Sequence, residues 1–460
     1  MDESNSVFLD NEREIERFVG IEANITPQNE GIGGIYKHNF KDFIVKEIIN
    51  DGITLEIKED YPTMAFSQHQ KDKYTTFNLI KINKDTFEVL RDLSQALKIS
   101  SELIHYSGLK DRVSISVQKI SIKGDYVDKL KRLNIRDVFI RSIKPTKKPV
   151  KIGGNWGNNF TITIRNIESK KNLSNQIENL INRINEHGFL NYFGLQRFGI
   201  YRPNSHLVGR YLLESRFEKA FKEYVSNIYL TESKNIQKIR SSLDIDGDLK
   251  KTYSEFPKSM YYERLMINHL IDNPNDFEGC FDLLPPDLKN LLISAFQSYI
   301  FNKMISLRAE KGISFNRPVK GDAISILDDV NGHITQTNYV YGNLQGKYDK
   351  FLNDAIKLNR AVIVIPIVGY DTNFGDFPLM STVFEEVIKK EKIDHNIFNS
   401  ELLYQFEFKG SFRAMMIKPI GLKIVELKDD DFFVGCKKLK IEFSLVKGTY
   451  ATMLLRELMK

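Results

Sequence analysis

The sequence predicts an α+β protein whose mixed, largely antiparallel sheet is interrupted by a large insertion. Alternating apolar and polar residues, typical of half-buried strands, occur near both ends of the chain. Residues 210–310 between them show mainly helical spacing. The length of 460 residues also exceeds one ordinary core and favours two or three domains. These observations agree if the two ends of the chain pair in one sheet.

The first part of the chain alternates predicted strands with predicted helices. The end of segment 33–48 and segment 160–167 alternate in the manner of strands, and another strand follows Asp111. Apolar residues at helical spacing predict helices over 85–99 and 173–187. These elements belong to the predicted sheet domain.

The middle and the end of the chain differ in pattern. The strongest helical stripe covers residues 289–310, and strand-like pieces follow around 318–345 and 361–368. Strand-like alternation returns near residue 410, with predicted strands at 412–425 and 437–446 and a helix at 450–460. We therefore predict one domain from residues 1–200 plus 410–460, and an insertion domain from residues 201–409.

Composition excludes several classes of protein. Hydrophobic residues at 42% and charged residues at 27% are typical of a soluble globular protein. The longest apolar run, 361–369, is shorter than the ~20 residues that span a bilayer. Residues 1–30 hold eight acids and two bases and lack the apolar region of a secretory signal. Two cysteines allow neither a disulfide framework nor a cysteine-rich zinc site. A cytoplasmic protein is expected.

The charge distribution is compatible with a polyanionic partner. The net charge is +6, and because residues 1–30 carry −6, the rest carries +12. Segment 141–151, RSIKPTKKPVK, holds five cations and would suit a phosphate backbone. A solvated basic linker is the simpler explanation of any single cluster, so charge alone does not identify the partner.

Common catalytic signatures are missing from the sequence. There is no H-E-x-x-H, C-x-x-C or G-x-S-x-G motif, and the eight histidines are scattered. Metal hydrolysis and cofactor-dependent redox chemistry therefore lose support, and we predict neither a metal nor a cofactor.

A lone carboxylate stands out at the start of the strand in segment 108–118, GLKDRVSISVQ. Lys110 and Arg112 flank Asp111, and neighbouring cations favour an ionised carboxylate. The alternative is that Asp111 merely caps a turn or pairs with Arg112, which is the commoner role of an arbitrary aspartate.

A second candidate segment is 191–202, NYFGLQRFGIYR, in which aromatic residues alternate with arginines. Aromatic rings stack on bases and arginines contact phosphates in RNA-binding proteins. An aromatic corner of the core explains the same segment equally well.

Four separated blocks of the chain together resemble the TruD family of RNA pseudouridine synthases. Segment 37–47, KHNFKDFIVKE, is similar to the family's first block, K-x-x-P-x-D-F-x-V-x-E, and segment 108–118, GLKDRVSISVQ, resembles the G-x-K-D motif that holds the catalytic aspartate. Segment 191–199, NYFGLQRFG, matches the family signature, and segment 448–458, GTYATMLLREL, is similar to the C-terminal block G-x-[FY]-A-T…L-R-E-L.

The blocks also depart from the family pattern. Phe40 and Val446 stand where proline is usual, and Ser114 and Ser116 replace the usual small Ala and Thr. These changes bear on local backbone shape more than on the catalytic groups. The chain is longer than bacterial members and looks more like archaeal or eukaryotic ones.

The resemblance implies a pseudouridine-synthase-type catalytic domain at 1–200 plus 410–460 and a TruD-type insertion domain at 201–409. It also implies a reaction that needs no cofactor, in which the uridine C1′–N1 bond breaks and the uracil rejoins through C5. Asp111 would be the catalytic residue, either as a nucleophile or as the base that removes a sugar proton, and both routes stay open. The resemblance gives Lys37 as its ion-pair partner.

The remaining expected site residues concern RNA binding. Phe193 is the expected stacking platform for a flipped base, and Asn191 would read a uracil edge or hold the Asp111 loop. Phe43 and Tyr450 are expected pocket walls, although core packing explains them equally well. Lys110 and Arg112 are expected to face outward to phosphate. Arg197 is a further expected substrate contact.

Other functions remain to be weighed. A non-catalytic RNA-binding protein or RNA chaperone could use the same pocket. A glycoside hydrolase would need a second carboxylate facing the first, and Glu47 and Glu457 are the possible partners. The expected partner is tRNA, with uridine 13 as the family's usual target. We expect neither a membrane partner nor a bound metal. The oligomeric state is open, with a monomer as the simpler expectation.

Overall fold

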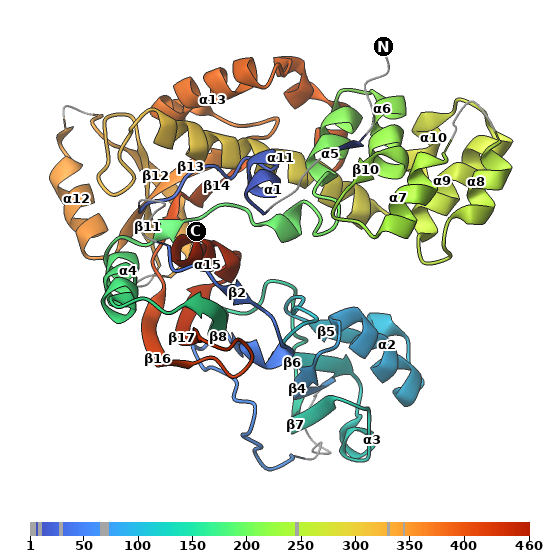
Figure 1. Ribbon diagram of the computed structural model, residues 1–460, viewed down its shortest axis with the longest axis horizontal. Coiled ribbons are helices and arrows are strands. Elements are labelled where there is room, and N and C mark those ends of the chain that lie inside the picture. Colours follow the sequence, from blue (N-terminus) through green and yellow to red (C-terminus); the bar gives the residue numbers. More distant parts are fainter. Residues whose placement is uncertain are drawn as a thin grey trace. The chain divides into compact units, whose positions relative to one another are not determined.

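The computed structural model (Figure 1) describes residues 6–7, 12–26, 31–64, 73–243, 248–328, 332–343 and 346–460. The chain forms two compact units. The sheet unit contains residues 25–189 and 417–460, and the middle unit contains residues 1–24 and 190–416. The predicted α+β class with a mostly antiparallel sheet is confirmed. The division into a catalytic and an insertion domain stays a prediction.

The sheet unit is built on a nine-stranded sheet. Its strands come from both segments of the unit, since β17 from the second segment pairs with β8 from the first. All pairings in this sheet are antiparallel except that of β3 with β6. In spatial order the strands are β16 (Ile420–Asp429), β17 (Cys436–Val446), β8 (Gly157–Glu168), β3 (Phe43–Ile48), β6 (Ile115–Lys123), β4 (Tyr74–Ile82) and β7 (Val138–Thr146), with β2 (Ile35–Tyr36) beside β8 and β5 (Ile104–Tyr106) beside β6.

The register determines which side chains share a face of this sheet. Val45 of β3 is aligned with Phe160 of β8 and with Ser116 of β6, and Ser116 is aligned with Lys81 of β4. Successive side chains of a strand point to opposite faces, so Glu47 lies on the same face as Val45. Lys81 of β4 and Glu47 of β3 are thus placed on the same face of the sheet, with β6 between their strands.

Among its described residues the sheet unit has four α-helices, and the predictions of helices over 85–99 and 173–187 are confirmed. Asp85 caps the first of them, since its carboxylate accepts a hydrogen bond from Phe87 N at 2.8 Å. The helices are α2 (Thr86–Leu97), α3 (Val127–Lys131), α4 (Leu173–His187) and α15 (Ala451–Met459).

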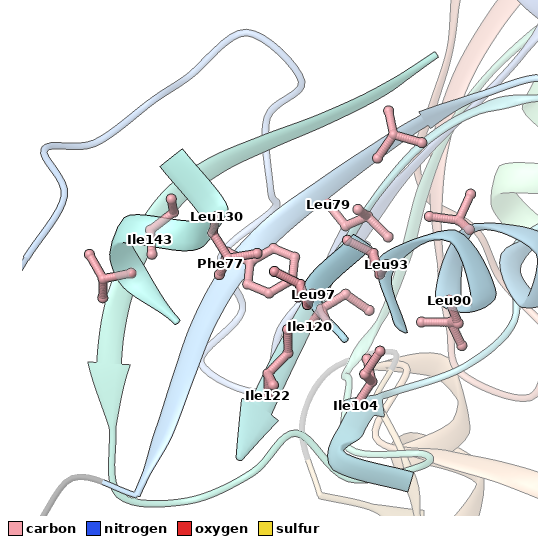
Figure 2. Packing of buried hydrophobic residues seen from close by; sticks show 13 residues of the cluster. Phe77, Leu79, Leu90, Leu93, Leu97, Ile104, Ile120, Ile122, Leu130 and Ile143 are labelled. Carbon is pink, nitrogen blue, oxygen red and sulfur yellow. The ribbon is translucent and has the colours of Figure 1, made fainter. Parts of the chain in front are cut away.

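Helices α2 and α3 lie beside strands β4, β6 and β7 (Figure 1). Apolar side chains of these helices and strands form one buried cluster. Figure 2 shows the ring of Phe77 in the middle of this cluster, where it is fully buried. The buried members are Phe77, Leu79, Val89, Leu90, Leu93, Leu97, Ile104, Ile120, Ile122, Val127, Leu130, Val138 and Ile143. Because this core lies directly beside the strands that bear the candidate site, it holds them in place.

The middle unit is mainly helical, with one four-stranded sheet in the order β12-β11-β13-β14. Its longest helix, α11, begins at Pro286, a residue that suits the first turn of a helix. The helices are α1 (Glu12–Phe18), α5 (Ser205–Leu213), α6 (Phe217–Phe221), α7 (Lys234–Ser241), α8 (Leu249–Glu255), α9 (Tyr261–Asp272), α10 (Phe277–Asp282), α11 (Pro286–Glu310), α12 (Asp349–Lys357), α13 (Pro378–Lys390) and α14 (Glu401–Gln405).

The strands of the middle unit lie mostly in the second half of the chain. They are β1 (Ser6–Val7), β10 (Ile228–Tyr229), β11 (Ala323–Leu327), β12 (Ile334–Val340), β13 (Ala361–Ile367) and β14 (Ser411–Ala414), while β9 (Phe189–Leu190) and β15 (Met416–Ile417) lie where the chain passes between units. Within the described ranges, no helix combines the length and apolar character needed to cross a membrane.

The packing around Phe77 predicts a large loss of stability on truncation. Phe77→Ala should lower the free energy of unfolding by about 3–5 kcal/mol, because the cavity it leaves lies in a closed core. Phe87, which is 57% exposed on α2, offers a matched control: Phe87→Ala should change stability by less than about 0.5 kcal/mol. Chemical denaturation measures both, and equal losses would contradict the assigned core.

Candidate active site

The loop of residues 107–114 joins β5 to β6 and presents Asp111. The carbonyl oxygen of Asp111 accepts two hydrogen bonds, one from Lys81 Nζ at 2.5 Å and one from Ser114 Oγ at 2.6 Å. The serine that departs from the family pattern at position 114 therefore has a local use. Two donors on one carbonyl fix the backbone from which the Asp111 carboxylate projects.

The carboxylate of Asp111 forms an ion pair with Lys37. Lys37 Nζ lies 2.9 Å from Asp111 Oδ2, and the side chains are 20% and 30% exposed. The same ammonium lies 4.2 Å from the centroid of the Phe43 ring, a cation–π contact. The pair is thus partly exposed, and solvent reaches part of the Asp111 side chain.

A second set of charges orders the segment that carries Lys37. Asn39 and Asp42 form a reciprocal cap on the short 3-10 helix Phe40–Asp42, so phenylalanine at position 40 is accommodated. Arg165 Nε donates to Asp42 Oδ1 at 2.8 Å, and Arg165 Nη1 donates to Asp430 Oδ1 at 3.0 Å. Burial alone would lower the pKa of Arg165, but these carboxylates raise it above its ordinary value.

Lys81 is a site residue that the sequence reasoning missed. Its side chain is fully buried, and its ammonium donates to the carbonyl oxygens of Asp111 and of Lys84, the latter at 2.8 Å. Burial lowers the pKa of Lys81 to about 8, against the opposing effect of the Asp111 carboxylate. A lysine inside the apolar run Leu79–Ile82 was the signal that could have revealed it.

The outward orientation predicted for Lys110 is wrong. Its side chain is 5% exposed, and Lys110 Nζ lies 3.2 Å from a carboxylate oxygen of Glu47. The backbone directs it inward, because Lys110 N donates to Thr86 Oγ1 at 3.0 Å and Lys110 O accepts from the same hydroxyl. The buried carboxylate of Glu47 also requires a cation. Arg112, by contrast, is exposed as predicted.

The two carboxylates considered for a glycoside hydrolase, Glu47 and Glu457, both form hydrogen bonds within the protein that stabilise the fold. Glu47 accepts hydrogen bonds from Ser107 Oγ and from Lys119 N in addition to its pairing with Lys110. Glu457 accepts from Thr26 N at 2.9 Å and from Thr26 Oγ1 at 2.5 Å. Such fully engaged acids are poorly suited to exchange protons with a sugar substrate.

The two predicted pocket walls of the sheet unit differ in burial. Phe43 is 2% exposed and packs edge-on against Phe160, with ring centroids 6.1 Å apart. Tyr450 is half-buried and directly precedes α15. Phe43 thus packs in the core and also contacts the ammonium of Lys37 at the candidate site.

Three further predicted site residues belong to the middle unit, namely Asn191, Phe193 and Arg197. Arg413 donates to Asn191 Oδ1 at 2.6 Å, and Asn191 Nδ2 donates to the Ala414 carbonyl at 2.9 Å. The guanidinium carbons of Arg413 and Arg197 lie 4.4 Å and 5.7 Å from the centroid of the Phe193 ring. The amide of Asn191 is therefore already engaged on both of its polar atoms.

Comparison with known proteins identifies the family. The family model described as "tRNA pseudouridine synthase D (TruD)" matches residues 18–458. The chain belongs to the TruD family. Its relatives in this family include the "Probable tRNA pseudouridine synthase D" of Methanosarcina barkeri, which is 34% identical over 97% of this chain and 98% of the relative.

Other TruD proteins agree in length and in structure. The "Probable tRNA pseudouridine synthase D" of Thermococcus sibiricus is 30% identical over 94% of this chain and 96% of the relative. A crystal structure of the "Putative tRNA pseudouridine synthase D (TruD)" from Methanosarcina mazei matches with a TM-score of 0.77 and 32% identity, covering 97% of this chain and 98% of that one. The predicted family and fold type are thus confirmed.

The low pKa of Lys81 predicts how stability depends on pH. The unfolded chain keeps the Lys81 proton up to its ordinary pKa of 10.5, whereas the folded chain releases it near pH 8. The unfolded state therefore binds more protons between these values, and folding becomes more favourable as the pH rises. Relative to Lys81→Met, the wild-type free energy of unfolding should rise between pH 7 and pH 10 by at most about 3 kcal/mol.

Urea unfolding of both proteins at several pH values measures this difference, in which the titration of other groups cancels. Lys171→Met, which changes an exposed lysine, serves as the control and should follow the wild-type pH profile. Parallel profiles for the wild type and Lys81→Met would show that the buried ammonium does not titrate in this range.

Proposed function

We propose that this protein is a cytoplasmic tRNA pseudouridine synthase that isomerises uridine 13 of tRNA through Asp111. The observation that carries the proposal is the Asp111 carboxylate, held on a fixed backbone, paired with Lys37 at 2.9 Å and still partly exposed. It lies in the block that matches the family's catalytic motif. The names of the TruD relatives supply the reaction and the RNA class.

The reaction makes limited demands on the protein, and the site meets them. The C1′–N1 bond breaks, a C1′–C5 bond forms, the C5 proton leaves and N1 ends with a proton, so the product is an isomer. Asp111 acts on the ribose either by attack at C1′ or by removal of a sugar proton, and both need an anionic carboxylate. Lys37 supplies the compensating positive charge and orients the carboxylate.

The target base must leave its stack to reach Asp111. We propose Phe193 as an aromatic platform for it, with Asn191 fixing its polar edge after exchange of the Arg413 contact. Phe43 and Tyr450 are proposed walls of the nucleoside site. Arg112 and Arg197 are proposed phosphate contacts, while the buried Lys110 is better suited to holding Glu47.

A non-catalytic RNA-binding protein is the alternative function. A protein that only binds RNA would not need the Asp111 carboxylate to be fixed in place and paired with Lys37, and this argues against the alternative. Release of tritium from tRNA labelled at C5 of uridine distinguishes the two, since only the isomerisation detaches that hydrogen. Binding without tritium release would favour the alternative.

Asp111→Asn should abolish pseudouridine formation while the affinity for tRNA changes by less than a few fold, because the amide cannot act as nucleophile or base. Asp92→Asn is a matched control, since Asp92 also pairs with a lysine at 2.9 Å and is 26% exposed. Mapping of pseudouridine in tRNA treated with each protein measures the outcome. Turnover by Asp111→Asn would remove Asp111 from the chemistry.

Lys37→Met should reduce kcat about 10- to 1000-fold, because Asp111 loses its hydrogen-bonding cation. Lys84→Met, which breaks the control pair with Asp92, should leave kcat within a few fold. Single-turnover tritium release compares these variants. A similar loss in both would indicate general destabilisation, and an unchanged rate in Lys37→Met would refute the assigned pairing.

A further inference from the structure

The basic loop, residues 147–154, is a cationic feature of the sheet unit that the proposed mechanism does not use. It follows β7 and contains Lys147, Lys148 and Lys151, which are all exposed. Within the described ranges, none of these three ammonium groups has a carboxylate in ion-pair distance. The basic loop therefore displays positive charge that the described part of the chain does not neutralise.

The backbone of the basic loop is attached to two segments of the candidate site. Gly153 N donates to the carbonyl of Ser107, the first residue of the Asp111 loop, at 2.7 Å. Lys447 Nζ donates to the Gly153 carbonyl at 2.6 Å, and Lys447 lies three residues before Tyr450. The basic loop thus lies beside the Asp111 loop on one side and beside the block of Tyr450 on the other.

A tight turn places an apolar side chain at the tip of this loop. Gly154 N donates to the Lys151 carbonyl at 2.8 Å, and Gly153 has φ of +67°, the pattern of a turn that requires glycine at its third position. Ile152, the second residue of the turn, is 83% exposed. Exposure of a large aliphatic group directly after Lys151, in a loop beside the candidate site, suits contact with a base.

The loop is anchored at both ends, so its position relative to the Asp111 loop is defined. Val150 N donates to Ser121 Oγ at 2.8 Å, and Asn155, which is buried, donates from Nδ2 to the Gly157 carbonyl at 3.0 Å. Trp156 N also donates to the Ile48 carbonyl at 2.9 Å. An anchored loop loses little conformational entropy on binding a partner.

We propose that the basic loop binds the phosphate backbone of the RNA next to the target uridine. Lys147, Lys148 and Lys151 contact phosphates, and Ile152 packs against the base beside the one that is extruded. A polyanion satisfies all of the unneutralised ammonium groups at once, which an acidic peptide of lower charge density does less well. This inference rests on the proposed function and adds to it the place where the backbone docks.

The triple variant Lys147→Ala/Lys148→Ala/Lys151→Ala tests the charge contacts in the full chain. Its affinity for tRNA, measured by fluorescence anisotropy between about 50 and 300 mM KCl, should fall at least about tenfold. The slope of log K against log salt should decrease by about two, since each single-stranded phosphate contact contributes about 0.7. The melting temperature should stay close to that of the wild type, because all three lysines are exposed.

The matched control removes three other exposed cations of the sheet unit, in Lys98→Ala/Arg132→Ala/Lys171→Ala. It should weaken binding by less than about threefold and leave the salt slope unchanged. Equal effects of the two triple variants would mean that only the overall charge matters, and this would overturn the docking site. So would wild-type affinity of the basic-loop variant.

Ile152→Ser tests the apolar contact separately. Stability should not change, since Ile152 is exposed, while kcat/KM on tRNA should fall about tenfold, in the range of one lost base contact. Val434→Ser, at another exposed apolar residue of the sheet unit, should leave kcat/KM unchanged. Wild-type kcat/KM in Ile152→Ser would refute this contact.

The outcomes also separate this inference from the proposed function. If the wild type releases no tritium from labelled tRNA, the proposed function fails. If the wild type is active and the basic-loop variant binds tRNA with wild-type affinity and salt slope, the docking site alone fails.

Discussion

The candidate site depends on a buried ammonium group that donates a hydrogen bond to the backbone of the Asp111 loop. Lys81 lies on β4, which is flanked by β6 and β7 and packed beneath α2 and α3, and its Nζ reaches the carbonyl of Asp111. The position of the carboxylate is therefore set by the core of the sheet unit and not by the flexible surface of a turn. Burial lowers the pKa of Lys81, so keeping its ammonium charged inside the sheet unit reduces the stability of the fold. In return, this ammonium orders the Asp111 loop.

The charges around the site divide into those that hold the structure and those open to a substrate. Arg165 with Asp42, and Lys110 with Glu47, are buried pairs that connect the site loops to the sheet. Lys37 with Asp111 is the partly exposed pair. A buried pair loses much when one partner is removed, whereas a partly exposed pair can exchange its contacts with an incoming molecule.

Much of the fold, and the ion pair at the candidate site, could be predicted from the sequence, for physical reasons. Alternation revealed β3 and β8, and helical spacing revealed α2 and α4, because half-buried elements must show one apolar face. The pairing of Lys37 with Asp111 came only from the family blocks, since 74 positions of sequence separate them. The inward turn of Lys110 depends on Thr86 and Glu47, and no local pattern encodes such a contact. Strand β7 was hidden by its cations, which made residues 141–146 look like a linker.

The antiparallel pairing of β17 with β8 brings together residues 436–446 and residues 157–168. During synthesis at the ribosome, β8 has no partner on this side until translation has passed Val446. The sheet unit thus completes its fold late, after the entire middle unit has emerged, and during that interval the edge of β8 is open to wrong pairings. A shortened chain that lacks these last strands would leave the cell with an incomplete sheet and a surface prone to aggregation.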